Sequence, residues 1–244
     1  MPLKICCVTC TAGRFSCLRR NVRMFLEQDY PNAIQLIYQN SPNYLQLDSS
    51  IPSEKVIIVN NYLDLQTGKR YETLGAIYRD ALTFIPEDVN IINHFDDDDF
   101  FLPQHISKGI EGIIQSGKTA YKAKKSIFLQ RGLLPILTEN VMEPSIFVVK
   151  EHVQKYGYGQ ETSAQHLQWV DPLIRKEQLF SDPYGTPTLA YNWNALGEEV
   201  FKTSGNSKNP ENFKNYHNYS QDYGQGILSP VSKEEIQEFY NKII

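Results

Sequence analysis

The sequence predicts an α/β domain with a mainly parallel sheet flanked by helices and a mixed C-terminal part. Through the first two-thirds of the chain, short apolar runs rich in β-branched residues alternate with segments whose apolar residues recur at helical spacing. Only short turns separate these segments, as in right-handed β-α-β crossovers. The chain has 244 residues of ordinary composition, 41% hydrophobic and 21% charged, which suits a single domain over 1–244.

The alternation is clearest before residue 115. Residues 3–9 form a continuous apolar run, which is typical of a strand buried on both faces. Residues 15–28 repeat apolar side chains at helical spacing, and the Tyr-Pro-Asn turn at 30–32 ends that helix. The other elements expected here are strands over residues 34–38, 56–59 and 89–95 and a helix over 71–84 that stops before Pro86.

The pattern loosens after residue 115. We expect strands over residues 119–129 and 145–149, of a kind that suits antiparallel pairing, and a helix over 163–176 that Pro172 kinks or breaks. Residues 202–226 are polar and are typical of a long loop. A C-terminal helix follows, because Ser232 and Glu235 form a capping box ahead of an apolar stripe.

Charge and cysteine placement restrict the class of protein. A net charge of −4 and a pI of about 5.8 exclude a generally basic nucleic-acid coat. No apolar run approaches the roughly 20 residues of a membrane helix, and the first residues lack the pattern of a signal peptide. All four cysteines lie within the first 17 residues, unlike a disulfide framework, so we expect reduced thiols in a cytoplasmic protein.

Four consecutive aspartates are the sharpest chemical feature. Asp96 to Asp99 follow the strand expected at 89–95 and precede two phenylalanines, so they are not a simple solvated tail. Their mutual repulsion would be relieved by Mg²⁺ or Mn²⁺, which binds one or two carboxylates together with phosphate oxygens. Alternation along an extended segment would point Asp96 and Asp98 the same way. The competing interpretation is a charged turn that caps the next helix.

Four segments, in register, resemble the family 2 glycosyltransferases of the GT-A type. The aspartate run with Pro103 is similar to the Asp-x-Asp motif of that family. The other matching segments are Val-Thr-Cys-Thr-Ala-Gly-Arg at 8–14, Phe-Leu-Glu-Gln-Asp-Tyr-Pro-Asn at 25–32 and Leu-Gly-Ala-Ile-Tyr-Arg-Asp-Ala-Leu at 74–82. The resemblance covers residues 3 to about 105 and implies a GT-A fold, with a nucleotide-sugar-binding half over 1–115 and an acceptor-binding half over 116–244.

The resemblance also implies a reaction and a set of ligands. The expected activity is transfer of a sugar, with inversion, from a nucleotide-sugar donor, foremost a UDP-sugar, to a hydroxyl of a glycan or another acceptor. A divalent cation, Mn²⁺ or Mg²⁺, would lie at Asp98 with help from Asp96. The residues expected around the donor are Thr11, Arg14, Asn40, Arg79, Asp80, Asp97, Asp99 and Lys202.

Three of these positions depart from the family pattern. Asn40 follows the second strand, where the family usually carries an aspartate that contacts the nucleobase. Asp80 stands where asparagine is common. Lys202 replaces a histidine that completes the metal site in the family, and a protonated lysine contacts a diphosphate rather than a metal.

The general base has two candidates. The family carries a Glu-Asp pair near the start of a helix, and the chain has no such pair in the matching stretch at 161–173. One alignment puts His166 at the position of the base, and another leaves Asp171 as the nearest acid. The two are five residues apart, so a regular helix does not present both on one face. The competing interpretations are a polar residue at a helix start for His166 and an ion-pair partner of Arg175 for Asp171.

Alternative functions remain open at this point. A protein that kept the fold and lost the base would bind a nucleotide sugar without turnover. Basic residues at 14–23 and at 122–131 would suit a DNA acceptor, as in enzymes that glycosylate modified DNA bases, although a solvated helix face is the preferred explanation. A nucleotidyltransferase would need a longer glycine-rich loop than the turn at 11–14.

Overall fold

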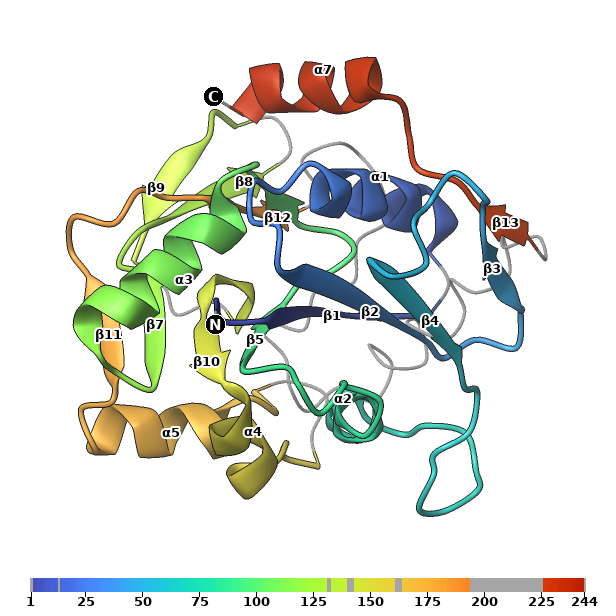
Figure 1. The fold of residues 1–244 in the computed structure, drawn as a ribbon, viewed down its shortest axis with the longest axis horizontal. Coiled ribbons are helices and arrows are strands. Elements are labelled where there is room, and N and C mark those ends of the chain that lie inside the picture. The colour runs from blue at the N-terminus through green and yellow to red at the C-terminus, as the bar shows by residue number, and fades with distance from the viewer. Residues whose placement is uncertain are drawn as a thin grey trace.

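A computed structural model describes residues 2–12, 14–130, 133–139, 143–160, 164–193 and 226–243 (Figure 1). Its centre is a seven-stranded sheet in the order β11-β7-β10-β5-β1-β2-β4. In chain order these strands are β1 (Ile5–Thr11), β2 (Ala33–Gln39), β4 (Val56–Asn60), β5 (Ile91–His94), β7 (Ala120–Ala123), β10 (Phe147–Val149) and β11 (Leu179–Asp182).

The sheet confirms the predicted α/β class. Strand β1 pairs in parallel with β2 and β5, and β2 pairs in parallel with β4. Strand β10 is antiparallel to both of its neighbours, β5 and β7. The C-terminal part of the sheet is therefore mixed, as the sequence predicts.

The prediction of a single strand over 119–129 is wrong, because two strands form there. The chain bends at residues 124–125, so β7 stays in the main sheet while β8 (Ser126–Gln130) joins a second sheet. That sheet has the order β6-β12-β8-β9, with β6 (Phe100–Phe101), β12 (Leu189–Trp193) and β9 (Ile136–Thr138). A third, two-stranded sheet pairs β3 (Leu45–Leu47) with β13 (Gly226–Leu228).

Helices cover both faces of the main sheet (Figure 1). Helices α1 (Phe15–Leu26), α3 (His105–Ser116) and α7 (Lys233–Ile243) bury apolar residues in the core on one face. Helices α2 (Leu74–Leu82), α4 (Lys150–Tyr156) and α5 (Leu167–Arg175) enclose a second core on the other face. The fully buried strands β1 and β2 separate these cores, which explains why their sequences are apolar without alternation.

Several local predictions can be checked directly. Helix α5 runs through Pro172, so the proline does not end it. The capping box is present, because Ser232 Oγ accepts from the Glu235 N–H and a Glu235 oxygen accepts from the Ser232 N–H. All four cysteines are buried free thiols, and burial raises the pKa of Cys6 to about 12. Most of the loop expected over 202–226 lies outside the described residues.

No helix in the described ranges is long and apolar enough to cross a lipid bilayer.

We predict that Gly109→Ala destabilises the protein by about 1–3 kcal/mol, because an added Cβ would lie 2.4 Å from the Phe147 ring where α3 crosses β10. Urea unfolding measures the change. Ile114→Ala is the control on the same helix, since Ile114 is 64% exposed and its loss costs at most about 0.5 kcal/mol. Equal effects of the two substitutions would contradict close packing at Gly109.

Candidate active site

The four aspartates lie at the carboxyl edge of the main sheet. Strand β5 ends at His94, and the chain then turns at residues 97–99, with the Asp99 N–H donating to the Asp96 carbonyl over 3.3 Å. Strand β1 runs beside β5 and ends at Thr11. In a parallel sheet the carboxyl ends of adjacent strands share one edge, and this brings Thr11 and Arg14 to the aspartates.

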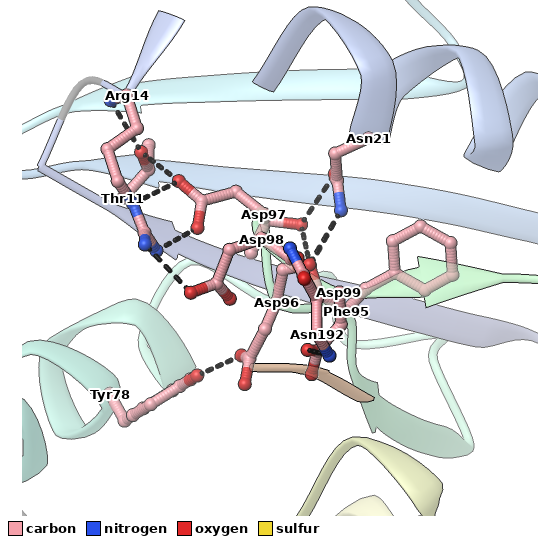
Figure 2. A network of polar contacts seen from close by, with 11 residues as sticks. Thr11, Arg14, Asn21, Tyr78, Phe95, Asp96, Asp97, Asp98, Asp99 and Asn192 are labelled. Atoms are coloured by element: carbon pink, nitrogen blue, oxygen red, sulfur yellow. Dashed lines mark hydrogen bonds and ion pairs between the residues drawn. The ribbon is translucent and has the colours of Figure 1, made fainter. Parts of the chain in front are cut away.

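Arg14 forms ion pairs with two of the four carboxylates (Figure 2). Its guanidinium forms an ion pair with both oxygens of Asp97 and donates to Asp98 over 2.8 Å. The hydroxyl of Thr11 donates to Asp97 over 2.7 Å. Arg14, Asp97 and Asp98 are all buried, so these charge-assisted contacts are shielded from solvent.

Asp96 has a hydrogen-bond partner of its own, on a different element. The Tyr78 hydroxyl, on α2, donates to Asp96 over 2.7 Å, away from Arg14 (Figure 2). The expected common direction of Asp96 and Asp98 assumed an extended segment. That assumption is wrong because the chain turns at 97–99.

Neighbouring strands and α1 hold the turn by its backbone. Asn21, on α1, donates to the carbonyls of Phe95 and Asp96. Asn192, on β12, donates its side-chain amide to the Asp98 carbonyl and its backbone N–H to the Asp99 carboxylate, both over 2.9 Å. The turn is therefore held from both α1 and β12, although Asn192 is more than 90 residues away in sequence.

The cluster retains an excess of negative charge. Burial and the charges of Asp99, Glu143 and Asp98 raise the pKa of Asp96 well above its ordinary value. Burial also raises the pKa of Asp97, even though Arg14 opposes this. A cation would lower both pKa values. Among the described residues, no group of three or more histidine, cysteine or acidic side chains is arranged to hold a metal by itself.

The side chain of Asn40 is buried without a partner. It follows β2, and its backbone N–H donates to the Thr11 carbonyl over 2.9 Å, which places it beside the end of β1. Neither side-chain amide atom of Asn40 forms a hydrogen bond. A buried, unpaired amide costs free energy, so this residue has unused capacity for a ligand.

Arg79 and Asp80 are engaged elsewhere. Arg79 forms ion pairs with Asp64 at 3.0 Å and Asp80 at 2.8 Å. Asp80 also accepts from the Tyr71 hydroxyl and the Leu65 N–H. These contacts fasten residues 64–71 to α2, and none of them involves the aspartate cluster. Lys202 lies outside the described residues.

A second cluster surrounds Glu143, a residue that the sequence analysis did not single out. Its carboxylate lies 3.1 Å from His94 Nε2 and 3.3 Å from His166 Nδ1, and it accepts from Gln165 over 3.0 Å. Glu143 is 7% exposed and belongs to a short 3₁₀ helix over Glu143–Ser145. No motif marks it in the sequence. The only available signal is an acidic residue directly before a buried strand.

Aromatic rings connect the two clusters. Tyr78, the partner of Asp96, stacks on Tyr158 with ring centroids 5.1 Å apart. The Tyr158 hydroxyl contacts His94 Nε2, and His94 is also the neighbour of Glu143. His94 in turn stacks on Trp169 of α5. The aspartates and Glu143 therefore belong to one continuous buried region.

A close backbone approach fixes this region. A Cβ on Gly75, at the start of α2, would lie 1.7 Å from the Gly159 carbonyl oxygen. Only glycine fits here, so α2 docks directly on the segment that carries Tyr158. The Gly159 N–H donates to the Gln165 carbonyl over 2.9 Å, which ties the same segment to the residue before His166.

The two candidate bases have different surroundings. His166 is partly buried against Glu143. Asp171 lies on the outer side of α5 and forms an ion pair of 3.5 Å with Arg175, in which the side chains are 46% and 78% exposed. His166 is the residue before α5, and the charge of Asp171 is one of the causes that raise its pKa.

The basic residues at 14–23 do not form a solvated helix face. Arg14 and Arg20 are buried, and Arg20 lies over the rings of Phe100 and Phe239. Arg19 and Arg23 donate to backbone carbonyls of Ser229 and Val231. The preferred explanation from the sequence is therefore wrong for this group.

The group at 122–131 is partly exposed. Lys122 is buried, whereas Lys125 is exposed and Lys124 forms an ion pair of 3.3 Å with Glu139 in which both side chains are about half exposed. Arg131 lies outside the described residues.

We predict that Asp96→Asn stabilises the protein at pH 7, without divalent cations, by about 1 kcal/mol. The raised pKa of Asp96 means that the folded state binds the proton more tightly, so this residue lowers stability as pH rises above about 4. The gain should therefore vanish near pH 4. Urea unfolding at both pH values measures it. Asp88→Asn is the control, since Lys4 lowers the pKa of Asp88 and no gain is expected.

Comparisons with known proteins agree on the fold. No protein-family model matches the sequence, and no curated protein matches it significantly. Two crystal structures of Staphylococcus aureus TarS 1–349 are similar to this chain, one in complex with UDP (TM-score 0.58, 11% identity) and one with UDP-GlcNAc (TM-score 0.57, 10% identity). Each match covers 91% of this chain and 68% of TarS 1–349. The likeness shows that the chain has a GT-A-like glycosyltransferase fold.

Proposed function

We propose that this protein is a glycosyltransferase that moves a sugar, with inversion, from a UDP-sugar to a hydroxyl of a glycan or another acceptor. The observation that carries the proposal is the buried acidic turn joined to Arg14 at the carboxyl edge of β1 and β5. Parallel α/β sheets bind ligands at this edge. The similar TarS structures hold UDP and UDP-GlcNAc, which supports a nucleotide-sugar donor.

The donor site would use residues that are already placed. Arg14 supplies positive charge for the diphosphate, and it stabilises the charge that develops on the leaving group. The unpaired amide of Asn40 is available to the nucleobase or the ribose beside it. Asp97 and Asp99 act chiefly on the turn itself, through their contacts with Arg14 and Asn192. Lys202 is retained as a further diphosphate contact, whereas Arg79 and Asp80 shape the loop at 64–71.

A divalent cation fits the donor set at Asp96 and Asp98. Mn²⁺ and Mg²⁺ bind one or two carboxylates when diphosphate oxygens complete the coordination, so the absence of a larger cage among the described residues is compatible with this role. The raised pKa of Asp96 indicates that the turn would gain from added positive charge. When bound, the cation would stabilise the leaving diphosphate as a Lewis acid.

Inversion requires that the acceptor oxygen displaces the diphosphate from the anomeric carbon in a single step. The acceptor oxygen forms a bond to the anomeric carbon as the bond from that carbon to the diphosphate oxygen breaks, and UDP leaves with the electron pair. The acceptor proton passes to a base of the protein. The surroundings favour His166 over Asp171, because His166 belongs to the buried region joined to Asp96 whereas Asp171 is paired with exposed Arg175.

We predict that Asp98→Ala lowers the rate of UDP release from UDP-GlcNAc at least about 100-fold, since it removes transition-state stabilisation at the leaving group.

We also predict that Asn40→Ala raises the Kd for UDP about 5- to 30-fold at unchanged fold, by the loss of roughly one hydrogen bond to an uncharged ligand group. Calorimetry with UDP and a coupled assay with UDP-GlcNAc, each with and without Mn²⁺, measure the two effects.

The matched control is Asp88→Ala, an exposed aspartate far from the turn, which should keep wild-type binding and turnover. Wild-type turnover in Asp98→Ala would reject the assigned site. Binding of UDP without any turnover, across a panel of UDP-sugars and acceptors that includes modified DNA, would instead support a non-catalytic nucleotide-sugar-binding protein.

A further inference from the structure

We propose that Glu143 is a positioning residue that holds the imidazole of His166 with Nδ1 inward, so that Nε2 takes the proton of the acceptor hydroxyl. The inference rests on the proposed function, and it assigns the missing acid of the family's Glu-Asp pair to a residue about 20 positions earlier in the chain. The two side chains meet only through the fold, because Glu143 lies in the 3₁₀ helix before β10 and His166 caps the start of α5.

The geometry distinguishes the two ring nitrogens of His166, because only Nδ1 faces Glu143. His166 Nδ1 is buried and has no hydrogen-bond partner in the structure, and the Glu143 carboxylate lies within ion-pair distance, 3.3 Å from it. The His166 side chain is nevertheless 19% exposed, so solvent reaches other atoms of the side chain. An ionised carboxylate accepts hydrogen bonds but cannot donate them, so it favours the tautomer with hydrogen on Nδ1 and the lone pair on Nε2.

The carboxylate itself is held in place. Gln165 donates to Glu143 Oε2 over 3.0 Å, and His94 Nε2 lies 3.1 Å from Oε1. Burial lowers the pKa of His166, but the charge of Glu143, the contact with its carboxylate and the charge of Asp171 together raise that pKa above its ordinary value. The titratable groups that act electrostatically on this pair are His94 on β5, Asp171 on α5, Asp96 after β5, Tyr78 on α2, Tyr158, and Cys10 on β1.

The proposed proton path balances within the displacement described above. The acceptor O–H bond breaks as its oxygen bonds to the anomeric carbon, and the proton goes to the Nε2 lone pair of His166. The resulting imidazolium lies beside the Glu143 carboxylate, which stabilises its charge. Glu143 keeps its charge throughout and touches neither substrate.

The test compares the pH dependence of kcat in the wild type, Glu143→Gln and Glu151→Gln. A base must be neutral, so kcat should rise with pH through the pKa of His166. Glu143→Gln removes the charge that raises this pKa, so the acidic limb should move to lower pH and the plateau should fall roughly 10- to 100-fold. Glu151, exposed on α4, is the matched control and should leave the profile unchanged. An unmoved acidic limb in Glu143→Gln overturns the proposal.

Three further measurements separate the possible outcomes. His166→Gly should lose activity about 10²- to 10⁴-fold and regain part of it with added imidazole. A severe loss in Asp171→Asn with a mild loss in His166→Gly would move the base to Asp171 and reject the proposal. NMR of the His166 ring nitrogens reports the tautomer without turnover, and it should show hydrogen on Nδ1 in the wild type.

The same measurements distinguish failure of the proposed function from failure of the role assigned to Glu143. A wild type that binds no UDP and turns over no UDP-sugar rejects the function and the proton path together. A wild type that releases UDP, but whose His166 carries hydrogen on Nε2, keeps the function and rejects only the role of Glu143.

Discussion

The site depends on the concentration of negative charge in a turn that has little access to water. Four adjacent carboxylates repel one another, and three of them are buried. The fold reduces this cost from several directions, through the guanidinium of Arg14, the hydroxyls of Thr11 and Tyr78, and amide donors that hold the backbone of the turn. These contacts leave Asp96 with a raised pKa, so the compensation is incomplete. Proteins accept such instability where charge is needed for a ligand.

Arg14 has one observed role and one proposed role, and both follow from its position. In the structure it pairs with Asp97 and Asp98, and in the proposed complex it faces a diphosphate. Arg14 is the last residue before α1, directly beyond the end of β1.

The sequence predicts the parallel part of the fold well, because buried parallel strands leave an apolar signal that depends only on local residues. The strands around Val8, Leu36 and Ile92 are present as expected. The second sheet was not predicted, since β6 and β9 are only two and three residues long, and β6 pairs with the distant strand β12. Strands this short contain too few residues to show the alternation of apolar and polar side chains that predicts a strand.

The same distinction applies to the site. Asp96 to Asp99 are adjacent in sequence, so the cluster is visible there, but the directions of the side chains depend on a turn that alternation does not predict. Arg79 matches a family motif, and only the structure shows that Asp64 and Asp80 engage it. Glu143 escapes sequence reasoning because its partners, His94 and His166, come from two other elements.

The contact between Gly75 and Gly159 has a mechanical consequence. With no side chain between them, α2 and the segment at 157–159 pack backbone against backbone. Each of the two carries one of the stacked tyrosines, Tyr78 and Tyr158. A displacement of Tyr78, for example when its carboxylate partner changes charge, is transmitted through that joint to the segment hydrogen-bonded to Gln165. The proposed sites of leaving-group departure and proton removal would then be coupled through one packed contact. That contact is made by Gly75 and Gly159, which take no part in the chemistry.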